Sequence, residues 1–219
     1  MIPGSPQILF LLASLIFGSV IFMHLSKRNT TIVFFYIIQS LVVSGLLLDL
    51  SIENASFFLI LTATITLVVK AIIAPYFFRR LIHRHNLKFS VSTYLNGPLT
   101  LVVLVLLTTF SYSHFFIPLS ILNPQNENAL LIALAMIFSS LFLIINRKGA
   151  LSQMMGILSL ENAIVTFAYI AGLEAGPALQ MGILFDILVW VIIATVFASM
   201  LFKQFGSLDV NEMKNLKEE

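Results

Sequence analysis

Long apolar segments alternate with short polar ones along almost the whole sequence. Seven segments are predominantly apolar, and each is long enough to cross a hydrocarbon core of about 30 Å as a helix rising about 1.5 Å per residue. Strands of a membrane barrel would alternate apolar and polar residues over about ten positions, and this alternation is not seen. The pattern predicts an all-α integral membrane protein with seven transmembrane helices. The predicted spans are residues 6–24, 31–50, 56–78, 98–118, 128–145, 152–173 and 178–203.

The composition supports this fold class. Of the 219 residues, 59% are hydrophobic and 10% are charged, whereas soluble domains have about 45–50% apolar and about 25% charged residues. We therefore expect a single membrane domain over residues 1–203 and a short tail over 204–219, which disfavours a soluble enzyme or a nucleic-acid-binding module. The chain has no cysteine, which excludes disulfides and thiolate metal sites.

The basic residues predict the orientation, because cytoplasmic loops collect Lys and Arg. Eleven of the twelve lie in alternate loops or in the tail, and the remaining loops hold acidic residues and no basic residue. The N-terminus is thus predicted outside and the C-terminus in the cytoplasm. The eleven are Lys27, Arg28, Arg79, Arg80, Arg84, Lys88, Arg147, Lys148, Lys203, Lys214 and Lys217.

Three charged residues fall well inside predicted spans, away from the span ends: Lys70, Glu161 and Asp186. A charge within the membrane costs several kcal/mol or more, so such residues usually face protein or water and serve a pathway. Glu161 is about 20 Å along its helix from Lys148, and Asp186 is about 25 Å from the cytoplasmic end of its own, so neither carboxylate reaches water. Lys70 is longer, and extension of its side chain toward the cytoplasmic headgroups stays open as an alternative.

The residues around Lys70 indicate an inward face. Thr62, Thr66 and Lys70 recur at a spacing of four and form a polar stripe on one side of the third helix. Pro75 cannot donate a hydrogen bond to the carbonyl of Ala71, which predicts an unpaired acceptor and a kink, a helix break, next to Lys70.

The sixth predicted helix has a similar polar stripe. Ser159, Asn162 and Thr166 flank Glu161, and ordinary helix packing is the alternative for each of them. Two small residues on the same helix would let another helix approach closely. These are Gly156 and Ala163.

A lysine and two acids in one bundle can form a static pair, bind an ion or exchange protons. Desolvation favours the neutral forms, and a nearby opposite charge favours the ionised ones, so such groups can be poised between two protonation states. A sodium site would need more oxygen ligands than the sequence offers, and the four histidines are too scattered for a metal set. We predict Glu161 and Asp186 as proton-relay acids and Lys70 as a relay base or their charge partner.

Several motifs resemble those of hydrogenase-4 component E, a membrane subunit of formate-hydrogenlyase-type complexes. They are R-K-G-A-L-S-Q-M-M-G-I-L-S-L-E-N-A at 147–163, G-S-L-D-V at 206–210, K-A-I-I-A-P at 70–75 and the Gly97-Pro98 start of the fourth span. The resemblance implies a subunit without catalytic residues or cofactors, in the inner membrane of a prokaryote. It also implies antiporter-like partner subunits and, indirectly, a peripheral arm with nickel, iron and iron–sulfur clusters.

Residues 128–203 are also similar to the K subunit of respiratory complex I and to the C subunit of Mrp-type antiporters. By this likeness Glu161 and Asp186 fall where the K subunit has two membrane glutamates, which implies proton translocation. The same module leaves two alternatives open. One is a subunit of a cation/proton antiporter or inorganic-carbon uptake complex, and the other is a structural scaffold in which the buried charges form a fixed pair.

A weaker pattern suggests an internal repeat. Residues 26–40 have the same layout as residues 146–162, a basic turn followed by a span with a polar pair. If helices 1–3 and 5–7 are parallel repeats, Gln39 and Ser40 lie near the level of Glu161.

Overall fold

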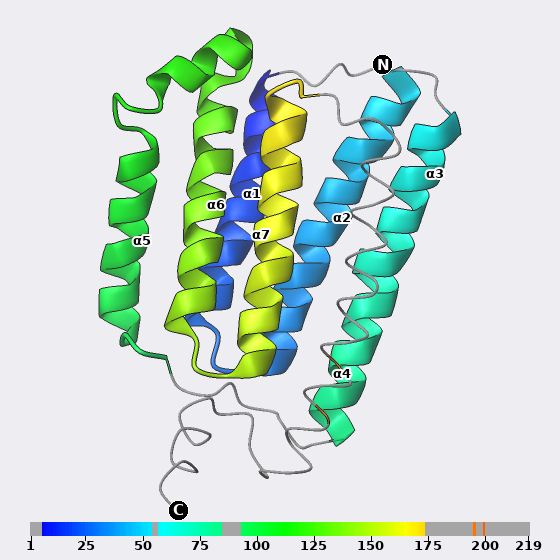
Figure 1. Cartoon of the computed structure of the whole chain (residues 1–219), viewed down its shortest axis with the longest axis vertical. Helices are drawn as coiled ribbons and strands as arrows, with labels where there is room; N and C mark the ends of the chain where they lie inside the picture. The colour runs from blue at the N-terminus through cyan, green and yellow to red at the C-terminus, as the bar shows by residue number, and fades with distance from the viewer. Residues whose placement is uncertain (1–5, 54–56, 85–92, 174–194, 196–198, 200–219) are drawn as a thin grey trace, which may run out of the picture.

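The computed structural model describes residues 6–53, 57–84 and 93–173, together with residues 195 and 199 (Figure 1). The predicted seventh span, with Asp186, and the tail over 204–219 lie outside the described residues apart from those two positions. Within α3 the side chain of Thr62 is also outside the described part.

The described part is helical, and an isolated bridge joins Thr93 to Arg147. The α-helices are α1 (Pro6–Leu25), α2 (Asn29–Glu53), α3 (Phe57–Thr66), α4 (Ala74–Arg84), α5 (Gly97–Ser111), α6 (Glu127–Asn146) and α7 (Ala150–Ile170). A π-helix, η1 (Leu67–Ile73), joins α3 to α4, and two 3-10 helices, η2 (Ile117–Leu122) and η3 (Pro124–Asn126), precede α6.

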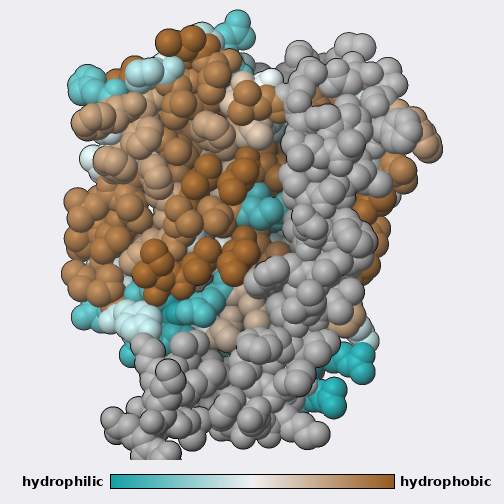
Figure 2. Space-filling model, viewed as in Figure 1, coloured by the Kyte–Doolittle hydropathy of each residue, from teal (hydrophilic) through white to brown (hydrophobic). Residues whose placement is uncertain are grey.

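Four described helices are long and apolar enough to cross a membrane: Pro6–Leu25, Asn29–Ile52, Pro124–Asn146 and Ala150–Ile170. They correspond to the first, second, fifth and sixth predicted spans, with ends that differ by a few residues. Figure 2 shows a face that is mainly hydrophobic at mid-height, with hydrophilic residues gathered toward the two ends. Both observations are compatible with a membrane-spanning protein.

The third predicted span is one uninterrupted helical run made of α3, η1 and α4. The sequence predicts a helix break at Pro75; the helical run continues through this proline, and a π-helix precedes it. The backbone N–H of Ala74 donates to the carbonyl of Val69, five residues back. This wider register accommodates a proline that has no N–H of its own, and it places Lys70 within the irregular segment.

The fourth predicted span is shorter than expected. The sequence predicts a helix over 98–118, but α5 ends at Ser111. The hydroxyls of Thr108 and Ser111 donate to the carbonyls of Leu104 and Thr108, at 2.7 Å each. Side chains that bond to nearby backbone compete with the helix, and here they occur where it gives way to turns.

The helices form a bundle in which α1 and α7 lie between α6 and α2 (Figure 1). Helix α5 packs on the outer side of α6, and the α3–η1–α4 run packs on α2. We call the end with the α1–α2 and α6–α7 turns the basic end, because Lys27, Arg28, Arg147 and Lys148 lie in these turns. The start of α1 and the 3-10 helices lie at the opposite end.

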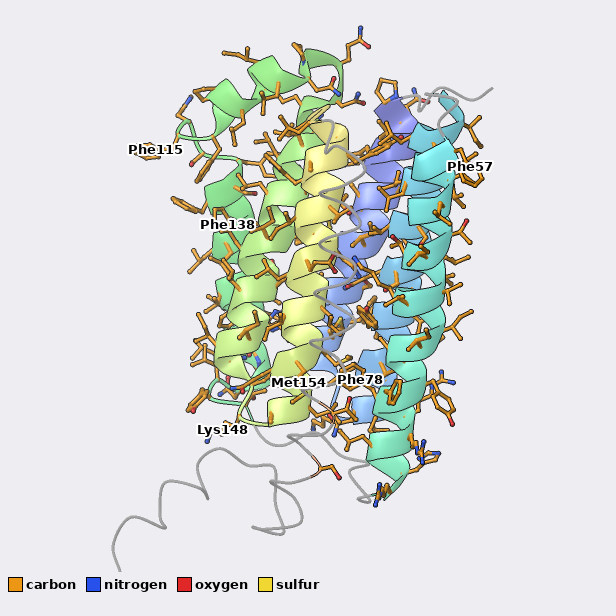
Figure 3. The ribbon with its side chains drawn as sticks, turned by 45° about the vertical axis from the view of Figure 1, so that its right-hand side comes forward. Phe57, Phe78, Phe115, Phe138, Lys148 and Met154 are labelled. Carbon is orange, nitrogen blue, oxygen red and sulfur yellow. The ribbon has the colours of Figure 1, made fainter. Side chains whose placement is uncertain are left out.

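Two hydrophobic clusters fill the bundle. The cluster at the basic end includes Met23, Tyr36, Phe78 and Met154, and Figure 3 shows Phe78 and Met154 close to this end. The second cluster, nearer the opposite end, is built from α1, α2, α6 and α7 and includes Ala163.

The sequence predicts that another helix approaches closely at Gly156. In the structure that helix is α6. A Cβ atom on Gly156 would lie 2.8 Å from Cγ1 and 3.2 Å from the backbone N of Ile144. Only a residue without a side chain fits there without movement of α6.

The basic residue Arg147 is buried, although the sequence predicts it as one of several loop charges. It is 2% exposed, and its guanidinium donates to the carbonyls of Met23, His24 and Ser26 at the end of α1. Burial lowers the pKa of Arg147 to about 10, so it stays charged at neutral pH. Arg147 thus caps α1 and fixes it to the α6–α7 turn.

We expect Gly156→Ala to lower the free energy of unfolding by about 1–3 kcal/mol, because the added methyl group overpacks the α6–α7 contact. The measurement is the thermal unfolding midpoint of the purified chain. Gly45→Ala is the matched control, since a Cβ there meets nothing within 4 Å and alanine favours helix by about 1 kcal/mol over glycine. Equal midpoints for the two variants would contradict the close contact.

We expect Arg147→Met to cost roughly 2–3 kcal/mol of stability, because each buried carbonyl left without a donor costs about 1–3 kcal/mol. Lys148→Met removes the same charge from the same turn but leaves the Arg147 cap intact, so it should have little effect. The Lys148 ammonium lies over the ring of Tyr94, 5.0 Å from its centroid. Unfolding midpoints of both variants test this. A Lys148 variant as unstable as the Arg147 variant would show that loop charge, not the cap, is responsible.

Candidate functional site

Polar side chains, all of them buried except the partly exposed Glu161, form a layer between the two hydrophobic clusters. Each of α1, α2, α6 and α7 contributes at least one member at the point where the helix passes from one cluster to the other, and η1 contributes Lys70. We call this set the mid-bundle layer. Its members are Ser19, Gln39, Ser40, Lys70, Ser139, Ser140, Ser159, Glu161 and Asn162.

An ion pair between Lys70 and Glu161 is the centre of the layer. The Lys70 Nζ contacts Glu161 Oε1, with side-chain exposures of 1% and 19%. The ammonium also donates to Asn162 Oδ1 at 3.1 Å. Lys70 therefore does not extend toward the headgroups, and that alternative is wrong.

Hydrogen bonds continue from the pair to α2 and along α7. Asn162 Nδ2 donates to Ser40 Oγ at 3.3 Å, and Ser44 Oγ donates to the carbonyl of Ser40 at 2.7 Å. Thr166 Oγ1 donates to the carbonyl of Asn162 at 2.8 Å. Asn162 thus connects three helices through one amide, which fixes the face that each helix presents to the pair.

The other predicted residues divide between the pair and its surroundings. Ser159 shares a hydrogen bond of 3.1 Å with Ser140 on α6, so it serves the α6–α7 contact within the layer. Thr66 is buried one turn before Lys70, at 1% exposure. Asp186 lies outside the described residues, so its relation to Glu161 stays a prediction.

Glu161 keeps one oxygen available. Its Oε2 atom is buried and makes no hydrogen bond with the described residues, while Oε1 contacts Lys70. A carboxylate with one oxygen in an ion pair and the other open can still accept a proton. This arrangement allows proton exchange, and it also allows a static pair.

Sequence reasoning found Ser40 of the layer only indirectly and missed Tyr36, which is in the adjacent hydrophobic cluster. Ser40 is at the level of Asn162, as the repeat pattern suggested, and α1 and α2 run in the same directions as α6 and α7 (Figure 1). Tyr36, one turn before Ser40, is 0% exposed and was not identified. A tyrosine in an apolar helix is common at membrane interfaces, and only a spacing of four from Ser40 could have indicated it.

The described residues contain no group of three or more His, Asp or Glu side chains that could hold a metal ion. His24 is used otherwise: its Nε2 bonds the carbonyl of Ser139 at 2.9 Å, and its ring stacks on Phe142. A surface pocket of about 350 Å³ is at the opposite end of the bundle, away from the pair. Its lining includes Pro6, Gln7, Phe10, Pro124, Asn126 and Glu127.

Comparison with known proteins gives one distant similarity. The chain is 30% identical over 91 residues to a protein of Mycobacterium tuberculosis (strain ATCC 25618 / H37Rv) named "Uncharacterized protein Rv0085". The match covers 42% of this chain and 41% of that protein, so the chain spans less than half of its length. No family model matches the chain, and no solved structure matches it.

Proposed function

We propose that this chain is a non-catalytic membrane subunit of an energy-converting, hydrogenase-like complex related to formate hydrogenlyase and complex I. In this proposal Lys70 and Glu161 belong to a buried proton-translocation path, with Asp186 as a further acid. The redox centres are in other chains. The observation that carries the proposal is the Lys70–Glu161 pair within the mid-bundle layer.

The chemistry of the pair supports proton exchange. Lys70 is 1% exposed and Glu161 is 19% exposed, and charges in direct contact influence each other strongly when little water separates them from the protein. Protonation of Glu161 would remove the partner of Lys70 and favour release of a proton from the lysine. A proton that arrives at one group can thus move a proton at the other, as a relay requires.

The proposed orientation has the basic end in the cytoplasm, in the inner membrane of a prokaryote. The basic turns and the end of α4, with Arg79, Arg80 and Arg84, lie at one end of the bundle (Figure 1). Positive residues near the ends of spans favour the cytoplasmic side.

We expect an externally added, membrane-impermeant maleimide to label Gln125→Cys in intact cells and His83→Cys only after permeabilisation. Both positions are exposed and lie at opposite ends of the bundle, and the chain has no cysteine of its own. The parent chain is the control for background labelling. The reverse pattern would overturn the orientation.

A scaffold role is the main rival, and the direct contact between Lys70 and Glu161 favours it. Removing one member of a buried pair costs about 3–5 kcal/mol, whereas replacing both by neutral groups is often tolerated. If the pair only holds helices together, a variant that neutralises both groups keeps assembly and function. If it relays protons, the same variant assembles but does not translocate.

We expect Glu161→Gln, in the native complex reconstituted in liposomes, to lower proton translocation by roughly 100-fold or more, since a positioned acid or base contributes about 10²–10⁴-fold. Hydrogenase activity with a soluble dye should persist. The measurements are pH change in the liposomes, dye reduction and complex abundance on a native gel. Glu127→Gln is the matched control, because it makes the same change at the start of α6, away from the layer.

Three outcomes would contradict the proposal. Unchanged translocation in Glu161→Gln removes the relay role. Normal translocation in the double variant Lys70→Met with Glu161→Gln supports the scaffold instead. Co-purified chains that include antiporter subunits and no hydrogenase would assign the chain to an antiporter or carbon-uptake complex.

A further inference from the structure

Tyr36 is a buried polar residue whose hydroxyl has no hydrogen bond to the described residues. It lies on α2 at 0% exposure and belongs to the hydrophobic cluster at the basic end. Its hydroxyl oxygen is buried and makes no hydrogen bond there. Buried hydroxyls almost always have a partner, so this position calls for an explanation.

The helix registers place Tyr36 one turn from the Lys70–Glu161 pair. Ser40 follows Tyr36 by four residues on α2, Glu161 follows Leu158 by three on α7, and Ala74 follows Lys70 by four. Leu158 and Ala74 belong to the same cluster as Tyr36. On all three elements the cluster is therefore about 5.4 Å, one helical turn, closer to the basic end than the pair is.

Tyr36 and Ser40 are four residues apart and so lie on the same face of α2, and Ser40 is bonded to Asn162, the neighbour of Glu161 on α7. Glu161 Oε2 is likewise buried without a hydrogen bond to the described residues. Ser40 Oγ accepts from Asn162 and has a proton of its own to donate. By helix register, three polar atoms with unused hydrogen-bonding capacity thus lie within about one turn of one another where α2 packs on α7, and two to four such partners are what an internal water needs.

We propose that Tyr36 Oη, Ser40 Oγ and Glu161 Oε2 bind one internal water molecule, and that Tyr36 is a positioning residue for Glu161 through this water. The inference deepens the proposed function and rests on it in one respect: the water is the proton-exchange partner of Glu161. The water gives a proton to Oε2 and regains one from the side of the basic end, so it is not consumed. The phenol stays protonated and holds the water in place.

The position on the basic-end side gives the water a specific role. The other polar neighbours of the pair, Asn162, Ser40 and Ser44, lie within the layer or beyond it toward the opposite end. Tyr36 is the polar member of the cluster that separates the pair from the basic end, within the described residues. A proton moving between Glu161 and that end would meet this hydroxyl first.

The test is infrared spectroscopy of the purified full chain, with the carboxyl band of Glu161 identified by subtraction of the Glu161→Gln spectrum. We expect Tyr36→Phe, which removes only the hydroxyl, to shift this band and to reduce its change on transfer to D₂O. Tyr76→Phe is the matched control and should leave the band unchanged, because Tyr76 is 61% exposed on α4. A high-resolution map should show water density between Tyr36 and Glu161, and Tyr36→Phe should lose it.

An unshifted band in Tyr36→Phe would overturn the inference, and so would a map in which Tyr36 contacts Glu161 directly without water. Both readouts are independent of transport. If Glu161→Gln leaves translocation unchanged while the band shift is seen, the proposed function fails and the water site stands. If Glu161→Gln abolishes translocation and Tyr36→Phe has no spectral effect, the water site fails alone.

Discussion

A lysine ammonium inside an apolar bundle must have a partner, and this requirement governs the structure around Lys70. The ammonium is 1% exposed and takes Glu161 and Asn162 as its partners. Leaving a buried charge alone would cost more than most single contacts contribute, so the three helical elements that bear the pair and its neighbours are held in one register. The mid-bundle layer follows from this constraint, because the amide of Asn162 then bonds Ser40 on α2.

The π-helix and the close α6–α7 contact both serve this placement. Lys70 lies within the wider register before Pro75, and π-segments are frequent at functional sites. Gly156 lets α7 approach the backbone of α6, which brings Ser159 within hydrogen-bonding distance of Ser140. The π-helix and the close contact at Gly156 therefore both lie next to residues of the mid-bundle layer.

The sequence predicts the existence of the helices better than the partners of their polar residues. Apolar length alone located four spans to within a few residues, because hydrophobic runs directly reflect the environment. The inward face of Lys70 was predictable from its stripe and from Pro75, but its contact with Glu161 joins residues 91 positions apart, which no local pattern encodes. Arg147 shows the converse limit. The positive-inside rule predicts its side of the membrane, but a sequence does not reveal that a loop arginine turns inward to cap another helix.

The two buried cations differ in the groups that hold them, and the difference bears on the proposed relay. Arg147 is held by backbone carbonyls, which do not titrate. Lys70 is held by a carboxylate, and a carboxylate can take up a proton. Protonation would remove the negative charge next to the Lys70 ammonium. Both cations are away from water. Backbone carbonyls stabilise Arg147 at the end of the bundle, whereas a titratable carboxylate stabilises Lys70 in the middle. Only the second arrangement connects the protonation of one group to that of another.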